Sequence, residues 1–209
     1  MIIKNKFYHP KTIERKANEL LADFYKSGVN EIIPPIEVDK ILELHLDLNV
    51  LWENFNDTNI LAGLIPNEKT VILNDDLKEE FNKSRGRENF TKAHEIGHWI
   101  LHVDHSAANA NPLPGFSRPY EVICRSKSED WDEKNADKFA SYLLMPKELI
   151  IKGGSEFNNW NDIYNVAEKF NVSATAMKIR LENLGYLFID DNGKFYKSKE
   201  ESFGQEKLI

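Results

Sequence analysis

The sequence FTKAHEIGHWILH, residues 90–102, places His94 and His98 four positions apart. Apolar residues recur around them at the spacing of an amphipathic helix, which predicts one helix from about residue 87 to 102. Two imidazoles four residues apart on a helix stand on one face and can bind a single ion. The His-Glu-x-x-His pattern therefore predicts a metal site, and zinc is the expected metal because nitrogen ligands suit it.

Gly97 stands inside this predicted helix. A glycine in a helix interior costs about 1 kcal/mol relative to alanine, so its presence needs a reason. We expect another backbone to approach the helix closely at this point, either a bound substrate or the edge of a sheet.

A catalytic zinc takes three protein ligands and leaves a fourth position for water, so a third ligand is required. His102 lies two turns, roughly 12 Å along the axis, from His94, and the two cannot share an ion. His105 or Asp104 could reach the ion only if the chain reversed sharply after His98. None of these three residues is the favoured third ligand.

Two further candidates follow later in the chain. Cys124 lies in a segment without regular pattern, so nothing in the sequence fixes its position. Glu133 lies on a second predicted helix, within WDEKNADKFASYLLMP, and Asp137 follows it one turn later on the same face. A carboxylate in the place of Asp137 can accept a hydrogen bond from a ligand histidine. We therefore expect Glu133 to be the third ligand and Asp137 to support it.

The rest of the sequence predicts an α+β fold with a domain at residues 1–154. Two amphipathic helices are expected before residue 47, followed by a small, mostly antiparallel sheet and a long connection at 104–130. The expected strands are NVLWENF, ILAGLIP and KTVILND, and the last two flank a hairpin turn at PNEK.

A second unit is expected at residues 155–198. Helices at 161–170 and 173–184, joined by a tight turn and followed by a hairpin at Asp-Asn-Gly, are typical of a helix-turn-helix or winged-helix-like unit. Ser173 is expected to cap the second of these helices. The tail at 199–209 has the composition of a disordered segment.

Composition restricts the function. No window approaches the roughly 20 apolar residues of a membrane span, and there is no signal sequence, so a soluble, cytoplasmic protein is expected. The single cysteine agrees with a reducing compartment. The net charge of −7 disfavours unguided binding to nucleic acid, which makes a protein the expected partner.

The segments FTKAHEIGHWILH, EKNADKFASYLLMP and VAEKFNVSATAMKIRLENLGYL, in this order, resemble the ImmA/IrrE family of cytoplasmic bacterial metallopeptidases. The resemblance implies a zincin-like core and a zinc-dependent endopeptidase that cleaves helix-turn-helix repressors. Carried over by position, the two motif histidines match His94 and His98, the motif glutamate matches Glu95, and the glutamate of the second block matches Glu133. Manganese or cobalt can occupy similar sites.

Within that mechanism Glu95 is the expected general base. It follows the first ligand but leaves the helix in another direction, so it is placed to take a proton from water rather than to bind the ion. Tyr120 and Tyr142 are the two candidates for stabilising the oxyanion. An extended substrate is expected to pair with the strand KTVILND, residues 69–75.

Two alternative functions use the C-terminal unit or the core differently. The helix-turn-helix pattern is also typical of a DNA-binding regulator, although Lys178 and Arg180 on its second helix are offset by Glu182. Direct DNA binding is therefore not favoured. The other alternative is a degenerate zincin that binds a partner without cleaving it.

Overall fold

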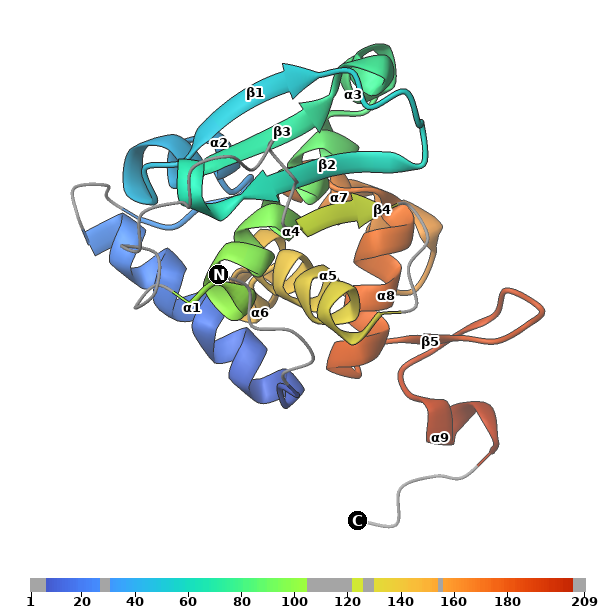
Figure 1. Ribbon diagram of the computed structural model, residues 1–209. Helices are drawn as coiled ribbons and strands as arrows, with labels where there is room; N and C mark the ends of the chain where they lie inside the picture. Colours follow the sequence, from blue (N-terminus) through green and yellow to red (C-terminus); the bar gives the residue numbers. More distant parts are fainter. Residues whose placement is uncertain (1–6, 27–30, 105–121, 126–129, 154–155, 205–209) are drawn as a thin grey trace. The chain divides into compact units, whose positions relative to one another are not determined.

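The computed structural model describes residues 7–26, 31–104, 122–125, 130–153 and 156–204 (Figure 1). The chain divides into two compact units. The first contains Met1–Ile32 and Ile36–Leu144, and the second contains Ile33–Pro35 and Met145–Ile209. The segment from Met145 onward therefore belongs to the second unit, whereas the domain boundary expected from the sequence at 154 stays a prediction.

Five α-helices of the described residues belong to the first unit: α1 Pro10–Lys26, α2 Val38–Lys40, α3 Lys78–Lys83, α4 Arg85–His102 and α5 Trp131–Leu144. The apolar positions that predict α1 are all buried, which confirms its amphipathic face. α2 continues into a π-helical turn, Ile41–His45. α1 packs against α5, and α5 is the main helical neighbour of α4.

The sheet of the first unit is mixed. Its strands are β1 Asn49–Glu53, β2 Ile60–Ile65, β3 Thr70–Asn74 and β4 Val122–Arg125, in the order β1-β3-β2-β4. β2 and β3 form the predicted hairpin through a 3-10 turn, Pro66–Glu68. β1 is parallel to β3, whereas β2 pairs antiparallel with both β3 and β4, so the sheet is mostly antiparallel, as expected. β3 inserts between β1 and β2, which are neighbours in sequence but not in space.

β3 is the central strand, and all five of its residues are buried. Because it pairs with β1 on one side and β2 on the other, it offers no edge to a peptide. The expectation that a substrate pairs with residues 69–75 is therefore wrong. A second correction concerns the connection at 104–130, where no regular structure was expected. It contains β4, which pairs with β2.

The second unit contains α6 Lys147–Lys152, α7 Trp160–Phe170, α8 Ala174–Leu184, β5 Phe188–Ile189, β6 Phe195–Tyr196 and α9 Lys199–Ser202. α7 and α8 are joined by a tight turn in which Asn171 takes a left-handed conformation, with φ of 52°. The Ser173 side chain accepts a hydrogen bond from the Ala176 backbone, so the predicted N-cap is confirmed.

Two details of this unit differ from the sequence expectation. In the hairpin turn Gly193 alone has a positive φ, 79°, so the Asn-Gly pair does not form the two-residue turn that it favours. The tail, expected to lack structure, contains the short helix α9, and the Ser198 side chain caps its N-terminus. Within the described residues no helix is long and apolar enough to span a membrane.

Candidate metal centre

α4 carries a row of buried polar side chains. His94, Glu95, His98 and His102 are each at most 2% exposed, although α4 is an amphipathic helix with ample surface. α4 contacts β2 and packs along α5, so the side chains between them are shielded from water (Figure 1). Buried ionisable groups are costly unless they contact one another, so their partners indicate their purpose.

The close approach predicted at Gly97 is made by α5. A Cβ atom on Gly97 would lie 3.0 Å from the Ala136 Cα and 3.1 Å from the Ala136 carbonyl oxygen. Neither a substrate nor a sheet edge is involved, so the expected neighbour was wrong and the expected close contact was right. Ala136 follows Glu133 by one turn, and the contact therefore sets how near Glu133 comes to the histidines of α4.

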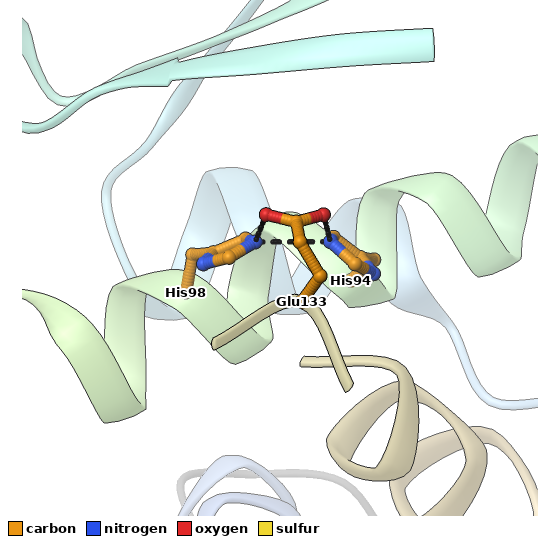
Figure 2. A group of neighbouring side chains, drawn as sticks. All are labelled: His94, His98 and Glu133. Atoms are coloured by element: carbon orange, nitrogen blue, oxygen red, sulfur yellow. Dashed lines mark hydrogen bonds and ion pairs between the residues drawn. The ribbon is translucent and has the colours of Figure 1, made fainter. Parts of the chain in front are cut away.

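Three ligand atoms converge where the two helices meet (Figure 2). The Nε2 atoms of His94 and His98 are 2.9 Å apart. The Glu133 carboxylate lies between the two rings, with Oε2 3.2 Å from the His94 Nε2 and Oε1 3.1 Å from the His98 Nε2. These three residues could hold a metal ion, with two ligands from α4 and the third, Glu133, from α5.

The spacing of these atoms fits a small divalent cation. Ligand atoms about 2.0–2.2 Å from a tetrahedral zinc lie about 3.3–3.5 Å from one another. The distances between the His94, His98 and Glu133 atoms fall within a few tenths of an ångström of these values. Two imidazoles and one carboxylate are also a donor set that zinc accepts.

Both histidines are held at their second nitrogen. His94 Nδ1 donates a hydrogen bond to Asp137 Oδ1 at 2.8 Å, so Asp137 lies where the sequence places it. His98 Nδ1 lies 3.0 Å from the Nδ1 of His102. His102 therefore contacts the candidate ligands without joining them, a role that sequence reasoning missed because it considered this residue only as a ligand. The i, i+4 spacing of His98 and His102 was the available signal.

The charges of these groups suit metal binding. Burial opposes the charge of Glu133, but hydrogen bonds from His94 and His98 outweigh burial and lower the pKa of Glu133 to about 2. Burial also lowers the pKa of His98, and burial together with the charge of His98 lowers the pKa of His102 to about 3. At neutral pH the site thus presents a neutral His98 imidazole and an ionised Glu133 carboxylate, which are the forms that bind a cation.

Glu95 differs from every other member of this group. It is fully buried, and among the described residues neither of its carboxylate oxygens has a hydrogen-bond partner. Burial raises the pKa of Glu95 to about 8, with opposing contributions from the nearby charges of His94 and Glu133. A carboxyl group with a pKa near neutrality, beside a candidate metal site, is suited to accepting and releasing a proton.

The remaining sequence candidates are not brought to the site. Tyr120 and His105 lie outside the described residues, and for Cys124 the structure describes the backbone alone. Tyr142 lies nine residues after Glu133 on α5. Nine residues are about two and a half helical turns, so Tyr142 leaves α5 on the side opposite Glu133 and is not an oxyanion ligand of this site.

Comparison with known proteins was made at the level of the fold and of the sequence. Among solved structures, the fold resembles that of a Mycobacterium tuberculosis transcriptional regulator, with a TM-score of 0.51 and 14% sequence identity. The likeness covers 90% of this chain and 56% of the regulator, so this chain spans little more than half of that protein's length. No curated protein matches the sequence.

The sequence also matches the Peptidase M78 family, described as the IrrE N-terminal-like domain, over residues 44–182. The matched region includes all three candidate ligands and most of the helices of both units. Since this region makes up well over half of the sequence, the chain belongs to the Peptidase M78 family of IrrE N-terminal-like domains.

Proposed function

We propose that this chain is a zinc-dependent endopeptidase with a gluzincin-like site on a zincin-like core. The observation that carries the proposal is the convergence of three buried ligand atoms beside a buried carboxyl group without a hydrogen-bond partner in the described part of the chain. A purely structural zinc site closes its coordination with four protein ligands. Within the described part of the chain three residues converge, which fits a site that keeps a position for water or a substrate.

His94, His98 and Glu133 would hold the cation, and manganese or cobalt could replace zinc there. A divalent cation in this place polarises a peptide carbonyl and makes water more acidic. Asp137 accepts a hydrogen bond from His94 Nδ1, so it keeps the Nε2 lone pair of that ring directed at the site.

Glu95 acts as the general base. Its carboxylate takes a proton from the attacking water and passes it to the leaving amide nitrogen. Glu95 lies beside His94, so a cation held by His94, His98 and Glu133 would favour the ionised form of Glu95 and lower its pKa from about 8. Burial then keeps the proton that Glu95 has accepted away from bulk solvent.

The proposed substrate is a helix-turn-helix repressor in the cytoplasm, and family membership together with the resemblance to ImmA/IrrE peptidases supports this choice. Such a protein would enter the site as an extended segment. Of the two edge strands, β4 is the one that contacts α4, and no described strand pairs with its outer edge. We therefore assign substrate pairing to β4 rather than to β3.

Cleavage of a candidate repressor by the zinc-loaded protein, followed by mass spectrometry of the products, tests the proposal. Glu95→Gln should bind zinc normally and reduce cleavage by about 100-fold or more, as expected for loss of a general base. Glu148→Gln, at an exposed position of α6, is the matched control and should cleave normally. Cleavage by Glu95→Gln at the wild-type rate would remove Glu95 from the mechanism.

The alternative function, a regulator that binds DNA directly, has one observation in its favour, the fold likeness to a transcriptional regulator. The second unit argues against it. Arg180 of α8 is 2% exposed and its Nε donates to the Met145 carbonyl at 3.0 Å, so it cannot reach a phosphate. Salt-dependent binding of the full chain to duplex DNA would favour this alternative. A partner-binding protein without activity would instead bind the repressor and leave it intact.

A further inference from the structure

His102 is the third histidine of α4, and its contacts go beyond packing. It is fully buried, one turn beyond His98, and its Nδ1 lies 3.0 Å from the His98 Nδ1. The Nε2 of His98 faces Glu133 and the ligand site. A neutral ring that offers Nε2 as a ligand atom carries its proton on Nδ1, so His98 Nδ1 donates to His102 Nδ1.

The second nitrogen of His102 completes the arrangement. If Nδ1 accepts, the proton of the neutral His102 ring is on Nε2. This Nε2 lies 3.5 Å from Oδ1 of Asp132, a buried carboxylate immediately before Glu133 in sequence. No hydrogen bond forms between these two atoms, so it is the nearby carboxylate oxygen, as an electrostatic partner of the Nε2–H, that favours the tautomer of His102 that can accept from His98. The chain of contacts runs from His98 through His102 to the first turn of α5.

The N-terminal segment encloses the same end of α4. The Tyr8 hydroxyl donates to the Leu101 carbonyl at 2.6 Å, and the Tyr8 ring lies 6.2 Å from the His102 ring. Tyr8 lies before the region that matches the family, so this support comes from outside that domain. His102 therefore has neighbours on several sides and little freedom to rotate.

We propose that His102, oriented by Asp132, is a positioning residue for the metal ligand His98. The inference rests on the proposed metal site and adds to it a second, distinct way of holding a ligand. His94 is oriented by Asp137, whose side chain is 56% exposed, whereas His98 is oriented by an imidazole that is 1% exposed. Loss of the buried partner cannot be compensated by water as easily as loss of the exposed one.

Three substitutions at one position separate positioning from packing. His102→Asn keeps an acceptor oxygen at the place of Nδ1, His102→Gln moves its amide one bond further to the place of Nε2, and His102→Leu removes the acceptor. The full-length protein is titrated with Zn²⁺ against a competing chelator, and the absorption spectrum of the Co²⁺ form is recorded. His45→Leu, which removes a histidine in edge-to-face contact with Phe24 elsewhere in the first unit, is the control.

His102→Leu and His102→Gln should lower Zn²⁺ affinity by about 10–100-fold and alter the Co²⁺ spectrum, as loss of an outer partner does in other metal sites. His102→Asn should restore both affinity and spectrum, and His45→Leu should change neither. If His102→Leu does not fold, the comparison of the Asn and Gln variants decides the question alone, because both carry an amide.

Wild-type affinity and spectrum in His102→Gln would overturn the positioning role and leave the metal site intact. Equal losses in the Asn and Gln variants would also overturn it, because they would show that only the bulk of the ring matters. Absence of Zn²⁺ binding by the wild-type protein would overturn the metal site itself. Failure to cleave a repressor affects neither measurement, so the two proposals fail independently.

Discussion

The two helix pairs of this protein, α4 with α5 and α7 with α8, bury polar groups in different ways. The α7–α8 pair contains one buried charged side chain among the described residues, Arg180, which is satisfied by a backbone carbonyl. The α4–α5 pair buries three histidines and three carboxylates close together. One buried charge with a backbone partner stabilises a fold, whereas several that converge on one point indicate a site.

The two pairs differ in whether their buried polar groups have hydrogen-bond partners within the protein. Arg180 is long, and its hydrogen bond fixes the chain at Met145 without any ligand. In the α4–α5 pair the Nε2 atoms of His94 and His98 face each other at 2.9 Å, and Glu95 contributes two buried oxygens with no partner in the described part of the chain. Two buried oxygens without a partner are unfavourable in the metal-free protein, which is a feature typical of a ligand-binding site.

The largest effect is expected from Glu133→Ala. This substitution removes the only candidate ligand contributed by α5. Zn²⁺ affinity should fall more than about 100-fold, which is the upper end of the effect of losing a residue that hydrogen-bonds a ligand. Competition with a chelating dye measures the affinity, with Asp137→Ala as a graded comparison and Glu148→Ala as a control. Zn²⁺ binding by Glu133→Ala at wild-type strength would show that the convergence of the three residues has no role.

The second effect concerns Glu95 in the metal-free protein. Below about pH 4.5 it is protonated in both states; from there to about pH 8 the unfolded chain releases the proton and the folded chain keeps it. This group therefore lowers the free energy of unfolding as pH rises through that window, by at most about 1.4 kcal/mol per pH unit. A glutamine at this position does not titrate, so Glu95→Gln does not lose this free energy of unfolding as pH rises.

The stability gained by Glu95→Gln over the wild type should therefore grow between pH 5 and pH 8 and then level off. Urea unfolding in the presence of a chelator, repeated across this range, measures it. A constant difference between the two proteins would mean that Glu95 titrates normally.

The third effect tests the contact between α4 and α5. Gly97→Ala gains about 1 kcal/mol of helix propensity, but a methyl group 3.0 Å from the Ala136 Cα forces the helices apart, at about 1–3 kcal/mol. We expect a net loss of stability together with weaker Zn²⁺ binding, because Glu133 moves with Ala136. Gly86→Ala, in the first turn of the same helix, is the matched control. Stabilisation of both variants would contradict the packing argument.

The smallest effect is expected in the second helix pair. Arg180→Met keeps the length of the side chain and loses the hydrogen bond to Met145, which should lower the free energy of unfolding by about 1–3 kcal/mol. Zn²⁺ affinity should not change. Lys178→Met, which removes a partly exposed charge paired with Glu182 at 3.4 Å, should change stability by less than about 1 kcal/mol. Weaker Zn²⁺ binding in Arg180→Met would contradict the view that the buried charge of α7–α8 serves the fold alone and only α4–α5 serves the metal site.

Local signals in the sequence predict much of the site. The i, i+4 spacing of His94 and His98, and of Glu133 and Asp137, is decided within single helices, and the structure brings these residues together as expected. The N-cap at Ser173 is local in the same sense. Family resemblance added the pairing of the two helices, which neither helix specifies by itself.

The errors concern contacts between segments distant in sequence. β3 has a near-continuous apolar pattern, which fits an edge or a central strand equally well until its neighbours are known. The pairing of β4 with β2 and the contact of Gly97 with Ala136 have the same cause. His102 was excluded correctly as a ligand, but its contact with His98 depends on the side-chain directions that buried neighbours impose.

The contact between Gly97 and Ala136 also has a consequence for how the sequence can change over time. Glu133 is held in place by helix packing rather than by the length of the segment that joins α4 to α5. Insertions or deletions in that connection leave the ligand spacing unchanged as long as the two small residues remain. Outside β4, the connection can therefore change in length without loss of the three-ligand geometry.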